Sequence, residues 1–145
     1  MTWQLKAFDE LTTAQLHDIY RLRVDVFVVE QHCPYPEIDG ADPACLHLFK
    51  EEGNQIAAYA RLLPPGTTYP SASIGRIIVA PEFRKQSLGF QLLDQAIAAA
   101  QKHWPGPLEI GAQAHLKDFY ASRGFNQVGE IYLEDGIPHM DMKRP

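Results

Sequence analysis

The 145-residue chain fits a single domain, 1–145, and is long enough to bury a core without disulfide or metal support. Its formal net charge of -5 argues against a nucleic-acid-binding surface, and no apolar run approaches the roughly 20 residues that span a bilayer. The start, Met1 to Lys6, lacks the basic and apolar blocks of a signal peptide, so we expect a cytoplasmic location and no membrane partner.

The chain has two cysteines, Cys33 and Cys45. A disulfide is not expected between them in a reducing compartment. His32 and His47 lie near them in the sequence, but the spacing is much wider than the tight cysteine pair of structural zinc sites. We therefore expect no metal.

The N-terminal part predicts a strand, a helix and an irregular segment. Apolar and polar residues alternate from Trp3 to Ala7, which indicates a strand. Thr12 and Gln15 form a capping box for an amphipathic helix that we expect to end near Val28. Its apolar face consists of Leu16, Ile19, Tyr20 and Phe27, with Arg23 on the same side. Prolines and a glycine make residues 30–45 irregular.

The remainder alternates strands with two helices. Strands are expected at Leu46–Glu51, Gln55–Leu63, Ser73–Ala80, Leu108–Ala112, Gln127–Tyr132 and Ile137–Lys143. The run Ile77-Ile78-Val79 indicates a strand buried on both faces. A long helix should start near Leu88 and end before Pro105, and a short one should cover His115–Arg123 and close at Gly124. Hairpins mixed with crossovers predict a mixed sheet flanked by helices.

The segment from Arg84 to Gly89 is the strongest indication of chemistry. It joins the predicted buried strand to the long helix, whose first N–H groups and partial positive charge favour an anion. Arg84 and Lys85 add charge, Gly89 permits close approach, and Ser87 could cap the helix or donate to a phosphate oxygen. The residues alone fit an ordinary strand-to-helix turn with solvated cations equally well.

Several motifs together resemble the GNAT acetyltransferases, and within them the ElaA-type branch. Arg84-x-x-Ser87-x-Gly89 resembles the acyl-CoA signature, Val79-Ala80-Pro81 the lead-in to it, and Phe119-Tyr120-x-x-x-Gly124-Phe125 the second landmark. The branch is indicated by the stretches Leu22 to Gln31, Cys33-Pro34-Tyr35, Ile38 to Asp42 and Glu134 to His139. This likeness covers essentially the whole chain.

The resemblance implies a fold and an activity. The fold is α/β (α+β), with a mixed, mostly antiparallel sheet of about six to seven strands, about four flanking helices, and two central parallel strands that splay apart. The implied activity is transfer of an acetyl group from acetyl-CoA to a primary amine by direct attack. Two departures, Ser87 for the first motif glycine and Gln113 for a frequent asparagine, leave open a CoA-binding or protein-interaction domain without turnover.

The resemblance also assigns roles to residues. The pantetheine arm would lie between Ile74–Val79 and Leu108–Ala112, with a backbone N–H near Ile78 polarising the thioester carbonyl. Tyr120 would protonate the leaving sulfur as general acid; read without the resemblance, it is a core aromatic. The cofactor-binding set is Ile77, Ile78, Val79, Arg84, Lys85, Gln86, Ser87, Leu88, Gly89, Phe90, Gln113, Phe119 and Arg123.

The general base has four candidates: Glu30, Glu37, His47 and His139. We place Glu30 first, because it directly follows the predicted helix end at the expected mouth of the cleft. Each of the four also fits an ordinary surface or buried structural role, so geometry must decide among them.

The acceptor is predicted from charge. Between Arg23 and Lys50 the chain has five acids and no Lys or Arg: Asp25, Glu30, Glu37, Asp39 and Asp42. In the family this stretch commonly lines the acceptor site, and an acidic lining would attract a cationic small-molecule amine or peptide; a solvated acidic loop is the alternative. The substrate residues would be Gln31, Tyr35, Glu37, Arg76 and His139, with Arg76 alternatively held in an ion pair. Many relatives form dimers, so a homodimer is a further expectation.

Overall fold

The computed structural model describes residues 3–145, so Met1 and Thr2 of the expected leaderless start lie outside it. The strands are β1 Gln4–Ala7, β2 Leu46–Glu52, β3 Gln55–Leu63, β4 Ala72–Val79, β5 Leu108–Gln113, β6 Asn126–Glu134 and β7 Ile137–Arg144. The α-helices are α1 Thr13–Val24, α2 Leu88–His103 and α3 Lys117–Ala121. Short 3-10 turns lie at Phe8–Glu10, Asp42–Ala44, Pro81–Phe83 and Ala114–Leu116, and a π-helical segment, η2, covers Asp25–Glu30.

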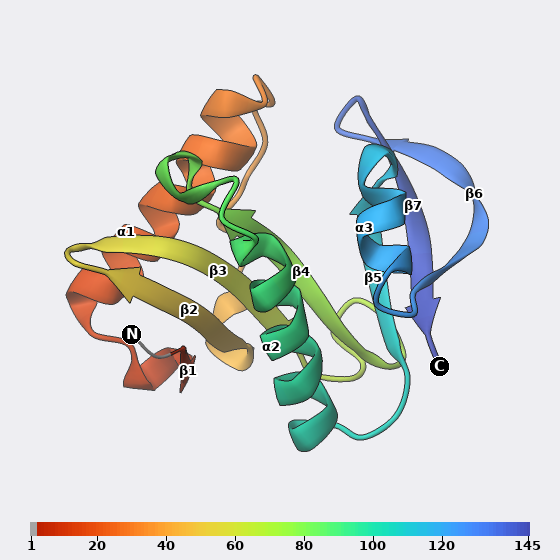
Figure 1. The fold of residues 1–145 in the computed structure, drawn as a ribbon, viewed down its shortest axis with the longest axis horizontal. Coiled ribbons are helices and arrows are strands. Elements are labelled where there is room, and N and C mark those ends of the chain that lie inside the picture. The colour runs from red at the N-terminus through yellow and green to blue at the C-terminus, as the bar shows by residue number, and fades with distance from the viewer. Residues whose placement is uncertain (1–2) are drawn as a thin grey trace.

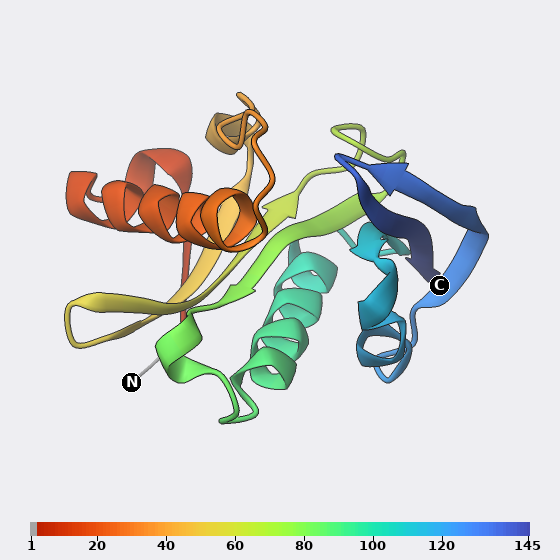
Figure 2. The same cartoon turned by 90° about the horizontal axis from the view of Figure 1, so that it is seen from above.

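The strands form one seven-stranded sheet in the order β1-β2-β3-β4-β5-β7-β6. Neighbours are antiparallel except the central pair β4 and β5. In Figure 2 helix α1 covers one face of strands β2 to β4, while α2 covers the opposite face. Figure 1 shows α3 beside β5 and β7 at the C-terminal end of the sheet. This confirms the predicted mixed, mostly antiparallel fold.

Helix α1 begins as the capping box predicts but ends differently. The Gln15 backbone N–H donates to Thr12 Oγ1 (3.0 Å), and the Thr12 N–H donates to Gln15 Oε1 (3.0 Å). The α-helix stops at Val24, before the expected Val28, and the chain continues as a π-helical segment to Glu30. Because π-helical segments occur frequently at functional sites, this change from α- to π-helix indicates that a functional site lies near residues 25–30.

Helix α2 supplies the main hydrophobic contact with the sheet. Its buried face is the predicted one: Leu88, Leu92, Leu93, Ala96, Ile97 and Ala100. These side chains join a core with residues of β3, β4, β5 and β7, including Leu62, Ile74, Ile110 and Met142. Burying one such aliphatic side chain contributes about 1.5–3 kcal/mol, so this face holds α2 against the sheet.

The central strands β4 and β5 separate soon after they meet. Among the described residues their parallel pairing consists of Ala72 with Leu108 and Ser73 with Glu109. Beyond this point β4 continues to pair with β3, and β5 pairs with β7 along its whole length to Gln113. The edge of β4 that faces β5 is therefore left without a neighbouring strand, which confirms the predicted splay.

Two local expectations need correction. The run Ile77-Ile78-Val79 is not buried on both faces, because only Ile78 is buried and its two neighbours are partly exposed. The expected single short helix is a 3-10 turn followed by α3, which ends at Ala121. Gly124 does terminate it as predicted, with a φ of +90° and the Phe125 N–H donating to the Tyr120 carbonyl (3.3 Å).

Within residues 3–145, none of the helices has the length and apolar character that crossing a bilayer demands.

Candidate active site

A cavity of about 760 Å³ opens where β4 and β5 diverge. A second hollow of about 390 Å³ adjoins it at the loop before α2, and the two share Val79, Arg84, Gly89 and Phe119. Of the predicted site residues, these line one or both: Ile77, Ile78, Val79, Arg84, Lys85, Ser87, Leu88, Gly89, Phe90, Gln113, Phe119, Tyr120, Glu30, Gln31, Tyr35, Arg76 and His139. Gln86, Arg123 and Glu37 lie outside both linings.

The loop before α2 has a left-handed backbone at two non-glycine residues. Lys85 has a φ of +69° and Ser87 a φ of +57°. In the described part of the chain the Ser87 side chain makes no capping hydrogen bond, so the suggested capping role is not observed. The left-handed region costs a residue with a Cβ about 1–2 kcal/mol. Ser87 therefore adopts the conformation for which the family signature uses glycine.

Arg84 is held in an ion pair with Glu30. Its Nη1 donates to Glu30 Oε2 (2.7 Å), its Nη2 to Glu30 Oε1 (3.0 Å), and its Nε to the Val79 carbonyl (3.0 Å). The hydrogen bond from Arg84 lowers the pKa of Glu30. A carboxylate stabilised in its ionised form is a weaker base. The role of Glu30 as base stays a prediction, and this pairing argues against it.

Tyr120 is buried in an aromatic cluster and also borders the cavity. Its ring packs edge-on against Phe119 (5.0 Å between centroids) and Phe125 (6.0 Å). Burial raises the pKa of Tyr120. The phenol is thus neutral and able to donate a proton at neutral pH. The core-aromatic reading and the acid reading therefore apply to the same side chain.

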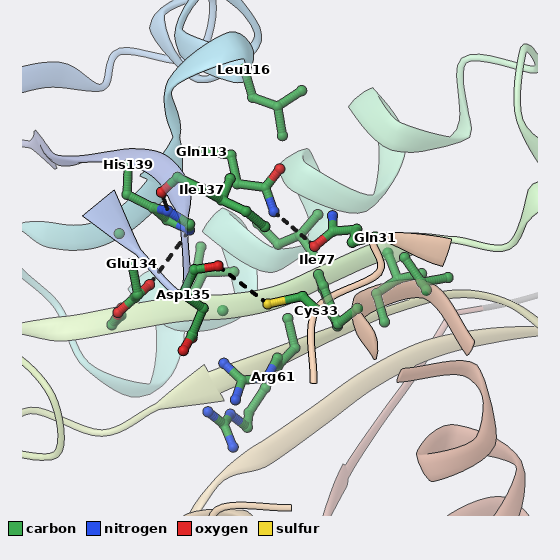
Figure 3. Close-up of a pocket in the computed structure, with 18 of the residues that line it drawn as sticks. Gln31, Cys33, Arg61, Ile77, Gln113, Leu116, Glu134, Asp135, Ile137 and His139 are labelled. Carbon is green, nitrogen blue, oxygen red and sulfur yellow. Dashed lines mark hydrogen bonds and ion pairs between the residues drawn. The ribbon is translucent and has the colours of Figure 1, made fainter. Parts of the chain in front are cut away.

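The predicted cofactor residues Gln113 and Arg123 contact other side chains. The Gln113 amide donates to Gln31 Oε1 (3.3 Å), which links the end of β5 to the segment after η2 (Figure 3). Arg123 pairs with Asp94 of α2 (2.6 Å), and its guanidinium lies over the Phe90 ring. Arg123 therefore stabilises the contact between α2 and the end of α3.

The predicted substrate residues Glu37 and Arg76 belong to a buried ionic network. Glu37 accepts from Arg23 Nε (2.8 Å), from Arg76 Nε (2.6 Å) and from the Tyr35 hydroxyl. Arg23 is fully buried, and its Nη1 reaches Asp42 Oδ1 (2.7 Å). The alternative interpretation of Arg76, an ion pair, is confirmed. Arg76 stands at a φ of +50°, where the pairing of β4 with β3 shifts register.

The same network neutralises the acidic stretch. Arg61 donates to both carboxylate oxygens of Asp39 (2.8 and 2.9 Å) and to Asp42 Oδ1 (3.2 Å). Burial opposes ionisation of Asp39, but the Arg61 hydrogen bonds outweigh it and lower its pKa to about 2. The stretch therefore does not present free carboxylates to an acceptor as predicted. Each of Glu30, Glu37, Asp39 and Asp42 has an arginine partner.

His47, another candidate base, is fully buried and has both ring nitrogens occupied. Its Nε2 donates to the Asp42 carbonyl (3.0 Å), which leaves Nδ1 to accept from the Tyr59 hydroxyl (2.6 Å). Burial lowers the pKa of His47. This histidine ties β2 and β3 to the loop that carries Asp42, and it is absent from the cavity lining.

His139 lies on the cavity wall near the β6–β7 turn (Figure 3). It pairs in register with Gln113, the last residue of β5. Its Nδ1 lies 2.7 Å from the Ile137 carbonyl and its Nε2 lies 3.4 Å from Glu134 Oε2. A carbonyl only accepts, so Nδ1 carries the proton in the neutral ring.

Sequence reasoning missed several cavity residues. Arg61 and Glu134 contribute charge to the lining, and Tyr69 and Tyr132 contribute hydroxyls that both donate to Asp141 (2.9 and 2.8 Å). Arg61 Nε is also the one buried polar side-chain atom in residues 3–145 that has no hydrogen-bond partner. These residues come from three separate segments, β3, the loop before β4, and β6, so sequence spacing carried no signal for them.

Comparison with known proteins agrees with this geometry. The family described as "Acetyltransferase (GNAT) domain" matches residues 15–144. The chain therefore belongs to the GNAT acetyltransferase family, a class of acyltransferases.

Within that family the chain is most readily compared with ElaA. It is 43% identical over 145 residues to Protein ElaA of Escherichia coli, covering 98% of this chain and 95% of the relative. The crystal structure of Escherichia coli ElaA matches with a TM-score of 0.93 at 41% identity, covering 99% of both chains. An acyl-CoA N-acyltransferase from Pseudomonas aeruginosa matches with a TM-score of 0.95 at 42% identity, again covering 99% of both.

Proposed function

We propose that the protein is an acetyl-CoA-dependent N-acetyltransferase that acts on a primary amine of a small cationic molecule or peptide. The observation that carries the proposal is the pair of adjoining hollows between the loop before α2 and Tyr120. They follow the edge of β4 that has no neighbouring strand. A pantetheine arm has the amide groups needed to pair with such an edge. The solved relative titled an acyl-CoA N-acyltransferase supports this reading.

The loop supplies the complementary charge for the cofactor diphosphate. Backbone N–H groups at the start of α2 are free to donate, because the first turn of a helix has no intrahelical acceptors for them. Lys85, Ser87 and Gly89 line this hollow. Arg84 also lines it and would exchange its Glu30 partner for phosphate oxygens. The residues present therefore fit the diphosphate of acetyl-CoA.

At the end of the hollow near Tyr120, the reaction requires a group that polarises the thioester carbonyl and an acid. A backbone N–H of the Ile77–Ile78 region would polarise the thioester carbonyl. Tyr120 would donate its phenolic proton to the departing sulfur; burial raises its pKa, so the resting phenol is protonated. The acceptor amine attacks the carbonyl carbon directly.

The first test measures binding and turnover separately. Acetyl-CoA should raise the melting temperature, because a ligand that binds only the folded state stabilises it. Release of the CoA thiol is then followed against a panel that includes spermidine, an aminoglycoside and lysine-containing peptides. Tyr120→Phe should keep the thermal shift and lose about 10²-fold or more in kcat. No shift at saturating acetyl-CoA would contradict the proposal.

A second test addresses the loop. A Cβ added at Gly89 would lie 3.7 Å from Phe119, which is ordinary contact, so substitution there is compatible with the fold. Gly89→Glu should abolish the thermal shift by acetyl-CoA, because a carboxylate would lie beside the diphosphate, while Gly89→Ala should keep part of it. Retained affinity in Gly89→Glu would show that the cofactor binds elsewhere.

The second candidate is a CoA-binding or protein-interaction domain without turnover. The left-handed Ser87 and the Gln113–Gln31 contact favour it, since both depart from the family pattern at the cofactor. A thermal shift with CoA but no thiol release toward any amine in the panel would support it. Cytoplasmic location and a homodimer remain proposals, and size-exclusion chromatography with light scattering tests the latter.

A further inference from the structure

The acceptor ammonium must lose a proton before it can attack, and three of the four candidate bases are already occupied. Glu30 is paired with Arg84 through both oxygens. Glu37 is buried and accepts from two arginines and a tyrosine. His47 is buried with both nitrogens hydrogen-bonded. Each would have to break charged or buried contacts to accept a proton.

We propose that His139 is the base of the transfer reaction and that Glu134 stabilises its protonated form. This inference rests on the proposed N-acetyltransferase function and names the residue that function still requires. The carrying observation is geometric: His139 borders the cavity, its Nδ1–H is committed to a backbone carbonyl, and its Nε2 is the nitrogen left with a lone pair (Figure 3).

The backbone contact sets the tautomer. The Ile137 carbonyl, 2.7 Å from Nδ1, can only accept, so the neutral ring has its proton on Nδ1. Glu134 Oε2 lies 3.4 Å from Nε2; the neutral ring has no proton there to donate to it, whereas the imidazolium does. A proton taken up at Nε2 therefore comes to lie beside the Glu134 carboxylate.

The other groups around the ring hold it in place. The Tyr132 ring of β6 stacks on it with centroids 6.2 Å apart. Tyr132 and Tyr69 both donate to Asp141, two residues along β7. Gln113 of β5 is its register partner, and its amide is directed to Gln31. From the β6–β7 hairpin, Glu134 and Asp135 line the cavity, and from other elements Asp39, Arg61, Arg76 and His115 line it.

The proton balance of the reaction follows. The acceptor ammonium loses two protons on becoming an amide. The first passes to His139 Nε2, directly or through one water, and then to solvent. As the new C–N bond forms and the C–S bond breaks, Tyr120 donates to the thiolate and regains the second proton from nitrogen. The sum is an ammonium and acetyl-CoA giving an amide, CoA thiol and one released proton.

The test compares kcat/KM against pH for the wild type, His139→Asn and His17→Asn. His17 is an exposed histidine of α1 outside the cavity lining, so it serves as the matched control. The amine with the highest thiol release in the panel is the probe. His139→Asn should lower kcat/KM about 10²-fold near neutral pH and remove the acidic limb of the profile, with the acetyl-CoA thermal shift unchanged. Glu134→Gln removes the carboxylate beside Nε2 and should lower kcat/KM less than His139→Asn does.

The outcomes separate this inference from the proposed function. If His139→Asn turns over as fast as the wild type with an unaltered pH profile, the role of His139 alone is overturned. Loss of the acidic limb in Glu30→Gln instead would overturn it as well. Absence of wild-type turnover would overturn the proposed function and this inference together. NMR of isotope-labelled histidine rings, assigned through His139→Asn, gives a reading that needs no acceptor: an Nε2–H tautomer at His139 at alkaline pH would also overturn the inference.

Discussion

At the residue scale, Ser87 is one of the non-glycine residues with a left-handed backbone. A serine at φ +57° carries a Cβ in a region that glycine occupies freely. We expect Ser87→Gly to stabilise the protein by about 0.5 kcal/mol, as relief of about 1–2 kcal/mol of strain exceeds the added entropy of the unfolded chain. Urea unfolding measures this change.

The same substitution at a right-handed position is the control. Ser122 has a φ of −60° and needs no glycine, so Ser122→Gly should destabilise instead. Equal losses of stability at the two positions would mean that the left-handed backbone at Ser87 carries no strain.

Glu30 gives a second prediction at this scale. Its carboxylate holds Arg84, the cation that we propose binds the cofactor diphosphate. Glu30→Gln should therefore tighten CoA binding by about two- to fivefold, since an exposed pair of this kind contributes about 0.5–1 kcal/mol. Isothermal titration calorimetry with CoA measures the constant. Weaker binding in Glu30→Gln would show that Glu30 positions Arg84 for the cofactor rather than competing with it.

At the element scale, the buried arginine of α1 determines where the loop of residues 30–45 lies. Arg23 reaches Glu37 and Asp42 in that loop from a fully buried position. We expect Arg23→Leu to cost about 3–5 kcal/mol, because it leaves the carboxylates of Glu37, Asp39 and Asp42 with two arginines, Arg61 and Arg76, and so with one uncompensated charge. Chemical denaturation compared with Arg21→Leu, whose side chain is exposed on the same helix, checks this. A loss in Arg23→Leu as small as in Arg21→Leu would contradict a stabilising role for the network.

Sequence periodicity predicted most elements well, because strands and helices with a buried face carry a regular pattern. The bounds of β3 and the buried face of α2 agree with the expectation. It did not predict the π-helical segment from Asp25, since an apolar pattern does not report a change of pitch. It also placed free acids where the structure has ion pairs. The arginine partners Arg61 and Arg76 are distant in sequence, and only folding brings them to residues 37–42.

At the scale of the whole molecule, the same network makes stability depend on acid pH. The pKa of Asp39 falls from 3.8 to about 2 on folding, and that of Asp42 is also lowered, as arginines outweigh the effect of burial. A carboxylate with a depressed pKa contributes its stability above its unfolded pKa and loses it as the pH falls through the folded value. The protein should therefore lose stability between about pH 4 and pH 2.

Thermal unfolding across this range measures the loss, and Asp39→Asn should flatten the slope. A melting temperature that is constant from about pH 4 to pH 2 would contradict the assigned shifts.

The divergence of β4 from β5 also has a mechanical consequence. The sheet has two parts, β1 to β4 and β5 to β7. In the described chain these parts are joined by only two residue pairs between β4 and β5. A molecule bound between β4 and β5 would act as an additional strand, hydrogen-bonded to β4 and packed against β5. Binding would then couple the motions of the two parts, and backbone amides of β5 to β7, which donate no hydrogen bond to the bound molecule, would exchange with solvent more slowly.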